Sequence, residues 1–551
     1  MSDSATTSSA STPPTSAPPS PELQTLSISD KIVTDEDKAE AAKLKAEANK
    51  AFAAHDFAKA VELYSSAIDK NPGDATIWCN RAYARMKLEE FGYALNDASA
   101  VPPITDASTP SPPQAYYRRA TCYLQTLRPQ LAVADFKRVL QIEPKNETVR
   151  AQLTSTQKLI RKIEFEKAIE VEGEKSPVER CREIIAEGGC DVDKGYAGPK
   201  LPQDEDGKYT ITLEFVRAMI EWFKDGKALP KRYVWEIVLA ANDIFSKEDS
   251  LVTLDIPEDV TIDVIGDVHG QYYDLLHLYS LTGEPSEKHY LLMNGDLVDR
   301  GSWSIEVILT ALSFKWLYPK YMFINRGNHE AKDMNRSYGF EGEAKTKHGE
   351  QSYKLFAHVF TTLPLATLIC ASKPPPSAGK AILSPDGKKR YFVVHGGLFS
   401  KDGVTLEDIR KLDRIGKQPG TEGLMCELLW TDPQAQPGRG PSKRNGVTGV
   451  IRSHEVRQGA SSVTSQCDNA DKVFVTFLHP TLPDGYEIEH DGLCTTVFSA
   501  PNYVDQVGNK GAFIRIDAAG SQEYIQFEAR PHPPMRPMAY VQGGLQNLMM
   551  M

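Results

Sequence analysis

Six short motifs between residues 266 and 503 combine carboxylates, imidazoles and amides in a pattern suited to divalent metal chemistry. In chain order they are Gly-Asp-Val-His-Gly (266–270), Gly-Asp-Leu-Val-Asp-Arg-Gly (295–301), Arg-Gly-Asn-His-Glu (326–330), His-Gly-Gly-Leu (395–398), Ile-Arg-Ser-His-Glu (451–455) and Ser-Ala-Pro-Asn-Tyr (499–503). Such groups are ligands for iron, manganese or zinc, and the motifs offer no thiolate. Two such ions about 3.5–4 Å apart can lower the pKa of a shared water, and the resulting hydroxide can attack phosphorus. The motifs therefore predict hydrolysis of a phosphate ester without a covalent enzyme intermediate.

The motifs are predicted to lie at the ends of short apolar strands. These strands are expected at 260–265, 289–293, 321–325, 391–394, at Ile451 and at 495–498. Strands are rigid and the loops after them are free to vary, so sheet-based enzymes place their chemistry there. One such motif alone could be an ordinary turn, and one His alone a core residue, but six in order make coincidence negligible. Apolar residues at helical spacing over 211–224 and 233–246 predict two helices before the first strand.

Residues 38–170 repeat with a period of 34 residues, and small side chains recur at the eighth and twentieth places. These small residues are Ala48, Ala60, Ala82, Ala94, Ala120 and Ala132. They would let two antiparallel helices approach closely, while Tyr64 and Phe136 fill the seam between hairpins. The third repeat starts four residues late, after the segment 101–113, whose five prolines cannot continue a helix. We expect stacked helical hairpins, closed by a helix over 147–169.

Composition excludes several functional classes. The formal net charge of -11 disfavours nucleic acid as the main partner. No apolar run reaches about 18 residues, so no membrane span is expected. The eight cysteines contain no Cys-x-x-Cys pair, which indicates a reduced intracellular chain and not a disulfide framework. We expect a monomer in the cytoplasm and nucleus.

The repeats resemble the tetratricopeptide repeat family, and residues 211–540 resemble the catalytic domain of the phosphoprotein phosphatases. The combination resembles the type-five serine/threonine protein phosphatases. This resemblance implies an all-α repeat array followed by an α/β metallophosphatase, which is a β-sandwich flanked by helices. The expected order is a disordered Ser/Thr/Pro-rich tail (1–35), the repeats (38–170), a linker (171–210), the catalytic domain (211–540) and a C-terminal regulatory helix (541–551).

The resemblance also implies the roles of the motif residues. Two divalent ions (manganese, iron or zinc) would be held by Asp267, His269 and Asp296 on one side and by Asp296, Asn328, His395 and His454 on the other, with Asp296 bridging. His329 would be the general acid that protonates the departing serine or threonine oxygen, and Asp299 would orient it. Arg300 and Arg444 would clamp the phosphate of a phosphorylated protein, with Tyr503 beside them. A surface ion pair is the alternative for Asp299 and Arg300.

The repeats are expected to bind a peptide. Lys45, Asn49, Asn80 and Arg118 lie where the family holds a terminal carboxylate, although a solvated helix face is the alternative for Lys45 and Asn49. The implied partner is the C-terminal tail of the ninety-kilodalton heat-shock chaperone. Gln114 stands where the family usually has Lys, which predicts weaker binding. By resemblance, the repeat domain covers the catalytic cleft, and chaperone tails or fatty acids activate the enzyme.

The sequence departs from the family around the last metal ligand. Only nine residues separate Arg444 from His454, where the family has a loop, a helix and a strand, and the segment 457–483 is an insertion. Asn445 also stands where the family has Gly. The favoured hypothesis is an active, autoinhibited protein phosphatase. The alternative is a catalytically impaired, chaperone-associated scaffold with an altered 445–485 segment. A nucleotide phosphoesterase is disfavoured, because Arg-Gly-Asn-His-Glu and Ser-Ala-Pro-Asn-Tyr are typical of the protein-directed family.

Overall fold

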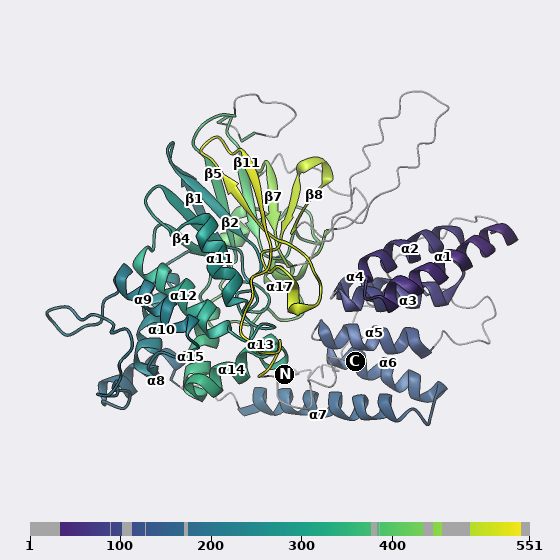
Figure 1. Ribbon diagram of the computed structural model, residues 1–551, viewed down its shortest axis with the longest axis horizontal. Coiled ribbons are helices and arrows are strands. Elements are labelled where there is room, and N and C mark those ends of the chain that lie inside the picture. The colour runs from purple at the N-terminus through teal and green to yellow at the C-terminus, as the bar shows by residue number, and fades with distance from the viewer. Residues whose placement is uncertain are drawn as a thin grey trace, which may run out of the picture.

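The computed structural model describes residues 33–88, 90–101, 113–126, 128–169, 175–375, 383–384, 386–433, 445–454 and 485–540. Four features predicted from the sequence lie outside these residues: Arg444, the insertion at 457–483, the helix expected at 541–551 and residues 1–32 of the expected tail. Figure 1 shows the described residues as a helical array beside a larger domain of sheets and helices. The predicted combination of an all-α repeat array and an α/β domain is therefore confirmed.

The helical array consists, in the described residues, of three antiparallel hairpins and a long closing helix. These elements are α1 (Asp35–Ala53), α2 (Phe57–Lys70), α3 (Ala75–Lys87), α4 (Phe91–Ala100), α5 (Pro113–Gln125), α6 (Pro129–Ile142) and α7 (Glu147–Ile169). All six alanines predicted to lie between the helices are completely buried, with 0% exposure. Tyr64 and Phe136 are buried in the cores of the first and last hairpins. The prediction that small residues allow close helix packing is therefore confirmed.

Local sequence fixes where these helices begin. The side chains of Asp56 and Asp74 accept hydrogen bonds from backbone N–H groups in the first turns of α2 and α3. Thr34 does the same for α1 as part of a reciprocal capping box with Asp37. In the third hairpin, Pro129 occupies the first turn of α6, where the N–H that proline lacks would have no helical partner.

The segment predicted to be a linker differs in the structure. Residues after 175 form α8 (Pro177–Ala186) and a loop that packs onto the catalytic domain, ahead of α9 (Leu213–Lys224) and α10 (Lys231–Phe245). Cys181 of α8 and Leu201 of the loop are buried in the same core as α9 and α10. The polar composition of 171–210 concealed these few apolar contacts, because a short helix needs only a narrow apolar face to dock.

Two sheets form the centre of the larger domain. One contains, in spatial order, β1 (Leu251–Ile256), β5 (Ala366–Ala371), β6 (Arg390–Val394), β7 (Gly449–Arg452), β9 (Cys494–Val497) and β8 (Tyr486–Glu489). The other contains β11 (Gln522–Phe527), β10 (Gly511–Ile516), β2 (Thr261–Ile265), β3 (His289–Met293) and β4 (Met322–Ile324). Apolar residues of both sheets, including Ile262, Leu292 and Val393, share one buried cluster. The predicted β-sandwich is therefore confirmed.

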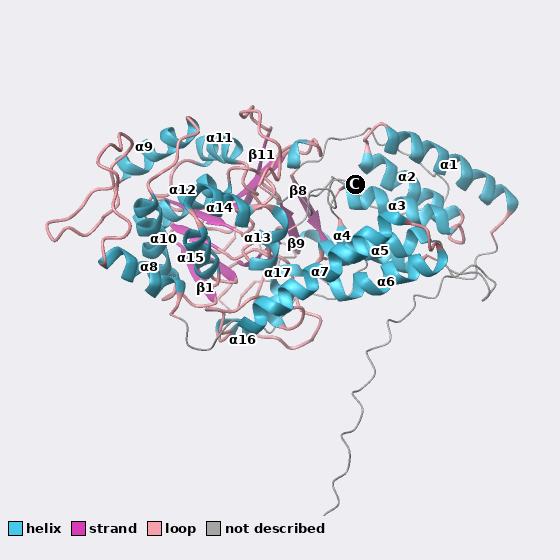
Figure 2. Ribbon diagram, turned by 90° about the horizontal axis from the view of Figure 1, so that it is seen from below, coloured by secondary structure: helices cyan, strands magenta, loops and turns pink. Residues whose placement is uncertain are grey.

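Helices cover the outer faces of this sandwich, as Figures 1 and 2 show. The remaining helices are α11 (Tyr272–Thr282), α12 (Ser304–Leu317), α13 (Lys332–Tyr338), α14 (Phe340–His348), α15 (Glu350–Phe360), α16 (Leu406–Arg410), α17 (Leu424–Trp430), and the 3-10 turns η1 (His490–Gly492) and η2 (Tyr503–Asp505). Helices α9 to α12 and α15 share a core with the five-stranded sheet. Strands β2, β3 and β4 run parallel, as do β6, β7 and β9. Their carboxyl ends therefore open in the same direction within each sheet.

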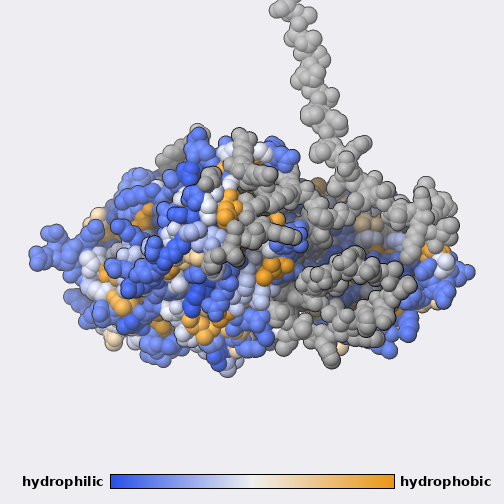
Figure 3. All heavy atoms as spheres, turned by 90° about the horizontal axis from the view of Figure 1, so that it is seen from above, coloured by the Kyte–Doolittle hydropathy of each residue, from blue (hydrophilic) through white to orange (hydrophobic). Residues whose placement is uncertain are grey.

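The surface of the catalytic domain is mainly polar. Figure 3 shows apolar residues on this face only as small separate groups among hydrophilic ones. Its most exposed large apolar side chains among the described residues include Leu398 after β6, Ile415 after α16 and Ile488 in β8, which belong to different segments of the chain. No described helix combines the length and the apolar character needed to cross a bilayer.

Candidate metal centre and catalytic pocket

The loops after the strands bring the predicted motif residues together in one buried site. These loops need unusual backbone geometry, since His269, Asp296 and His454 all have positive φ values, of 48°, 51° and 77°. Such conformations cost on the order of 1–3 kcal/mol each and persist only where the surrounding structure imposes them. Gly327 is required for another reason, because a Cβ there would lie 2.1 Å from Asp296 Oδ1. The chain is therefore shaped around Asp296.

The imidazoles and carboxylates converge on Asp296. Its Oδ2 lies 3.5 Å from His269 Nε2 and 3.3 Å from His395 Nε2. The ligand atoms of Asp296, His395 and His454 lie within 4.8 Å of one another, and so do those of Asp296, His269 and His329. Asn328 completes this arrangement, since its Oδ1 lies 2.8 Å from His395 Nε2. Asp296 thus lies between His269 and His395, as expected of a bridging ligand, and the predicted general acid His329 lies beside it.

The geometry of the ring nitrogens fits metal binding. His269 Nδ1 lies 3.1 Å from the carbonyl oxygen of Val298, and His395 Nδ1 lies 2.9 Å from that of Asn294. Each Nδ1 can therefore donate to a carbonyl, and the unprotonated Nε2 then faces the carboxylates. Asp267 Oδ2 is fully buried, lies 3.7 Å from His269 Nε2 and has no hydrogen-bond partner among the described residues. An orphaned carboxylate oxygen that faces a ligand nitrogen fits a divalent ion placed between them.

Burial shapes the charge of this site. It raises the pKa of the Asp267 carboxyl well above its usual range, and it raises the pKa of Asp296 to about 8. It also lowers the pKa of the His269 and His454 imidazoles well below the usual value. Carboxylates in such a place ionise readily only beside positive charge, while neutral imidazoles remain free to coordinate. Divalent ions would supply that charge, so the residues present fit the predicted cofactor.

His329 and Asp299 form a buried pair beside these groups. His329 Nδ1 lies 2.9 Å from Asp299 Oδ2, while the other Asp299 oxygen accepts from the backbone N–H of Phe340 at 2.9 Å. Asn335 donates to Asp299 at 3.2 Å and to the carbonyl of His329 at 2.7 Å. Asp299 is completely buried, which argues against the alternative of a surface ion pair. Sequence reasoning did not identify Asn335, which lies outside the motifs.

Arg300 and Tyr503 are each held by an aromatic contact next to the histidines. The guanidinium carbon of Arg300 lies 3.8 Å from the ring centroid of Tyr338, and the residue is 5% exposed. The Tyr503 ring lies 5.1 Å from that of His269. Arg300 and Tyr503 both line the pocket that contains His269 and His329. Stacking on Tyr338 fixes the plane of the guanidinium, whose forked N–H groups match the geometry of an oxyanion.

Glu330 is a structural residue of the site that the sequence analysis quoted in a motif without giving it a role. Its carboxylate is completely buried and accepts hydrogen bonds from the backbone N–H groups of Asp296, Leu297 and Gly327, each at 2.8 Å. The side chain therefore ties the loop after β3 to the loop after β4. Its position at the end of Arg-Gly-Asn-His-Glu was the only signal in the sequence.

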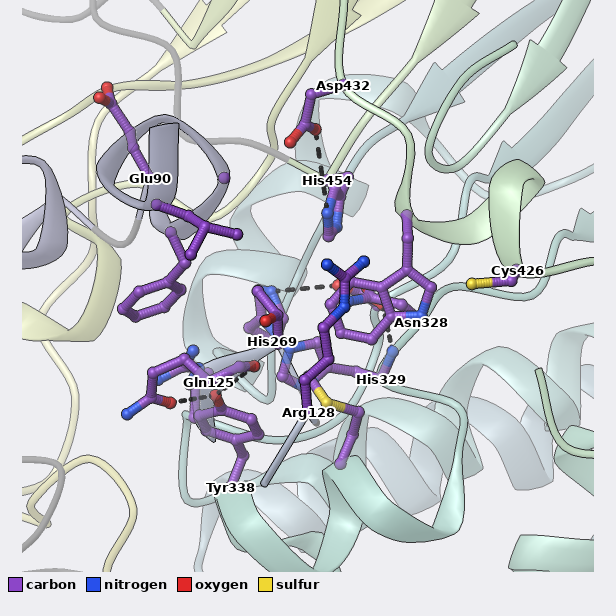
Figure 4. Close-up of a pocket in the computed structure, with 18 of the residues that line it drawn as sticks. Glu90, Gln125, Arg128, His269, Asn328, His329, Tyr338, Cys426, Asp432 and His454 are labelled. Atoms are coloured by element: carbon purple, nitrogen blue, oxygen red, sulfur yellow. Dashed lines mark hydrogen bonds and ion pairs between the residues drawn. The ribbon is translucent and has the colours of Figure 1, made fainter. Parts of the chain in front are cut away.

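The catalytic pocket is also lined by the helical repeats. Figure 4 shows Gln125 and Arg128 from the repeats beside His269, His329 and His454. The hydroxyl of Tyr338 donates to the carbonyl of Gln125 at 3.3 Å and is also bonded to its side-chain oxygen. These contacts join residues more than two hundred positions apart, so no local pattern could predict them.

The expected peptide clamp is partly assembled. Asn80 donates to the side chain of Asn49 at 3.3 Å. One guanidinium nitrogen of Arg118 is buried and has no hydrogen-bond partner among the described residues. Lys45 instead bonds Asp74 at 3.2 Å. The structure therefore brings Asn49 and Asn80 together and leaves Arg118 able to receive an anion, while Lys45 is held by a neighbouring acid.

Comparison with known proteins identifies both parts of the chain. A family model described as the PPP5 TPR repeat region matches residues 153–253, which run from α7 to β1. A model described as calcineurin-like phosphoesterase matches residues 260–463, which include the motifs up to His454. A solved structure from Saccharomyces cerevisiae, described as a serine/threonine phosphatase with similarity to human phosphatase PP5, is 38% identical. It covers 60% of this chain and 100% of its own, with a TM-score of 0.49.

Full-length relatives extend this similarity. Serine/threonine-protein phosphatase T of Aspergillus oryzae is 43% identical over 525 residues, covering 92% of this chain and 98% of the relative. Serine/threonine-protein phosphatase 5 of Homo sapiens is 39% identical over 511 residues, covering 93% of this chain and 95% of the relative. Such identity extends through the repeats and the catalytic domain alike. The chain therefore belongs to the type-five family of protein serine/threonine phosphatases.

Proposed function

We propose that this serine/threonine phosphatase acts through two divalent ions of manganese, iron or zinc and is held inactive by its own repeat domain. The main observation is that one carboxylate oxygen of Asp296 lies close to ligand nitrogens of both proposed sets, 3.5 Å from His269 Nε2 and 3.3 Å from His395 Nε2. When bound, the ions would provide an activated water and draw charge from the phosphate oxygens. The ligands would be Asp267, His269, Asp296, Asn328, His395 and His454.

The remaining residues would position the substrate and move one proton. Arg300 would hold phosphate oxygens by charge-assisted hydrogen bonds, and Arg444 and Tyr503 are proposed to assist it. His329 would protonate the departing serine or threonine oxygen from Nε2, because its Nδ1 is engaged by Asp299 at 2.9 Å. The substrates would be proteins that carry phosphoserine or phosphothreonine.

Metal removal tests this proposal. Chelation should abolish hydrolysis of a phosphothreonine peptide, and added Mn²⁺ should restore it. Asp296→Asn should lose both turnover and bound metal measured by mass spectrometry, whereas Asp255→Asn, an exposed change on β1, should lose neither. A folded, metal-loaded chain without turnover would instead support the alternative, a catalytically impaired chaperone-associated scaffold.

We further propose that the repeat domain inhibits the enzyme by occupying the mouth of the catalytic pocket. Residues of α4, the end of α5 and the turn before α6 line the pocket together with His269, His329 and His454. A second link supports this arrangement, since the hydroxyl of Tyr93 in α4 donates to the carbonyl of Pro433 at 3.0 Å. A phosphoprotein could reach the site only after these contacts separate.

Weakening the Gln125–Tyr338 link tests the inhibition. Gln125→Ala should raise basal activity about fivefold, because a hydrogen bond contributes about 1 kcal/mol to the closed state. Gln130→Ala, on the exposed side of α6, is the matched control and should leave basal activity unchanged. Equal basal activities for wild type and Gln125→Ala would contradict a closed state held by this contact.

We also propose that the repeats bind the C-terminal tail of the ninety-kilodalton chaperone, with release of inhibition as a result. The buried, unsatisfied nitrogen of Arg118 supports a carboxylate ligand at this position. Asn49, Asn80 and Lys45 would complete the clamp after Lys45 leaves Asp74. A terminal Met-Glu-Glu-Val-Asp peptide should bind wild type and lose affinity for Arg118→Ala. Loss of binding after amidation of the peptide would identify the carboxylate as the recognised group.

We also propose a location in the cytoplasm and nucleus. It is supported by free thiols among the described residues. Five of them are buried: Cys79, Cys122, Cys181, Cys190 and Cys370. Microscopy of a fluorescent fusion would test the location, and sedimentation would test the expected monomer.

A further inference from the structure

The buried pair of His329 and Asp299 is connected to the first turns of two helices outside the catalytic pocket. One carboxylate oxygen of Asp299 accepts from the backbone N–H of Phe340, the first residue of α14, at 2.9 Å. The backbone N–H of Asp299 donates to Ser304 Oγ at 3.1 Å, and Ser304 is the first residue of α12. The position of Asp299 therefore depends on where both helices begin.

Glu343 of α14 holds the start of α12. Its Oε1 accepts from the backbone N–H of Ile305 at 2.9 Å, and its Oε2 accepts from that of Ser304 at 3.2 Å. Trp303, which precedes α12, makes no side-chain hydrogen bond to this end of the helix. The carboxylate of Glu343 therefore takes the place of a local cap, and its charge suits the positive end of the helix dipole.

The two helices are thus held by their first turns in a reciprocal way. Asp299, in the loop before α12, binds the first N–H group of α14. Glu343, in the first turn of α14, binds the first two N–H groups of α12. A shift of either helix start would therefore reach Asp299, through Phe340 on one side and through Ser304 on the other.

Lys347 supports Glu343 from the next turn of α14. Its Nζ donates to Glu343 Oε1 at 2.8 Å and to the two carboxylate oxygens of Glu306 at 2.9 and 2.7 Å. Glu343 is 1% exposed, and a carboxylate so deeply buried would be costly without a cation beside it. The arrangement is therefore built around a buried charge that could not be lost without rearrangement.

We propose that Glu343 is a positioning residue for the general acid, acting on His329 through Ser304 and Asp299. This inference rests on the proposed role of His329. Within the described part of the chain, the hydrogen bonds of Glu343 go to α12 and Lys347 and not to the metal ligands. His329 must hold Nε2 within hydrogen-bond reach of the departing oxygen, and a misplacement of about 1 Å can cost about 100-fold in rate.

Leaving groups of different basicity separate this role from general support of the fold. Phenyl phosphate releases a more basic oxygen than p-nitrophenyl phosphate, so its hydrolysis depends more on the proton from His329. The two substrates are similar in size, so closure by the repeats should affect both alike. Glu343→Gln would place an NH₂ group against an N–H group of α12. In the Mn²⁺-loaded full chain, kcat should fall about tenfold for phenyl phosphate and less than about twofold for p-nitrophenyl phosphate.

Two further variants give the ratio of these kcat values its meaning. Glu350→Gln makes the same change at an exposed position at the start of α15 and should keep the wild-type ratio. His329→Asn should shift the ratio further than Glu343→Gln does. An equal loss on both substrates in Glu343→Gln, or an unchanged ratio, would overturn the proposal, and so would a loss of bound metal measured by mass spectrometry. If His329→Asn left the ratio unchanged, the proposed general acid would fail and this inference with it.

Ser304→Ala tests the same connection if Glu343→Gln does not fold. It removes the Oγ atom that accepts from Asp299, while Glu343 can still bind the N–H groups of α12. The ratio should shift in the same direction by up to about fivefold, the effect of one neutral hydrogen bond. A folded, metal-loaded Ser304→Ala chain with the wild-type ratio would overturn the proposed action through Ser304.

Discussion

Residues of the metal centre act through the backbone as well as through their ligand atoms. Asp267, His269 and Asp296 could be predicted as ligands because their motifs resemble, in order and spacing, those of the phosphoprotein phosphatases. The role of Glu330 could not, since its partners are three backbone N–H groups that leave no pattern in the sequence. The same holds for Asn335, which braces the His329–Asp299 pair from outside any motif.

Replacing Glu330 by Gln should loosen the metal centre. A Gln side chain has one oxygen and an NH₂ group, so it cannot accept all three N–H groups, and its donors would face backbone donors. We expect metal affinity to fall about 10–100-fold, as for other residues that orient ligands, together with a lower melting temperature. Competition with a metal-sensitive dye would measure the affinity.

Glu407→Gln, an exposed change on α16, is the control for this experiment. Normal metal affinity in Glu330→Gln, with only the melting temperature lowered, would assign Glu330 to folding and not to the metal centre. High Mn²⁺ should recover part of the activity if weak metal binding is the cause.

At the level of elements, periodic patterns predicted well and contacts between segments did not. The strand expected at 289–293 and the helix expected at 147–169 agree with β3 and α7, because an apolar run before a polar motif indicated the strand and the repeat array required a closing helix. Helix α8 was missed because it is short and lies in a polar segment. The segment 528–540 was also missed as a structural element, since its chain has neither helical nor strand periodicity.

This segment, here called the C-terminal strap, connects the loops of the active site. The backbone N–H of Arg530 donates to Asp274 at 2.7 Å, and that of Met538 donates to the carbonyl of Arg300 at 2.7 Å. Between Arg530 and Met538, the carbonyl of Arg536 accepts a hydrogen bond from the hydroxyl of Ser302 at 2.7 Å. The strap therefore helps to hold Arg300 from outside the pocket.

The attachment of the strap should depend on the charge of His532. Its Nδ1 lies 2.9 Å from the carbonyl of Pro533 and its Nε2 lies 3.0 Å from Asp505, so both acceptors are satisfied only by the doubly protonated ring. Burial opposes the charged form, but these two hydrogen bonds outweigh it and raise the pKa of His532. A raised pKa means that the stabilisation is present below about pH 6.5 and is lost as pH rises through the folded-state value.

His532→Gln should therefore lower the melting temperature more at pH 6 than at pH 8.5. Differential scanning fluorimetry of both proteins across this range would measure the difference, with His55→Gln, an exposed change beyond α1, as the control. A deficit that grows as pH rises would have the wrong sign for a protonated ring. It would show that the neutral ring holds the strap.

For the whole molecule, resemblance predicted that the repeats cover the cleft but not which residues do so. The links from Gln125 to Tyr338 and from Tyr93 to Pro433 each join one domain to the other. Side chains at such a junction need only fit one another, so they follow no periodic rule. These links also explain how a ligand of the repeats could affect the catalytic site. The repeat domain would either bind the ligand or cover the pocket, so the two states would compete.

That competition gives Gln114 an effect on activity at a distance. Gln114 is exposed at the start of α5, the helix that also carries Arg118 and Gln125. Gln114→Lys would restore a cation to the proposed clamp and should tighten binding of the acidic chaperone tail about fivefold at low salt, since one charge-assisted contact adds about 1 kcal/mol. Fluorescence anisotropy with a labelled tail peptide would measure this gain.

The concentration of tail peptide that gives half-maximal activation should fall by the same factor, since binding and opening are linked. Gln130→Lys adds the same charge on α6 and separates a specific clamp from general attraction of an acidic peptide. An equal gain in peptide affinity in both variants would mean that the added charge attracts the acidic peptide without a specific clamp. Tighter binding by Gln114→Lys without easier activation would mean that the tail binds the repeats while they still cover the pocket, which would break the proposed link between recruitment and release.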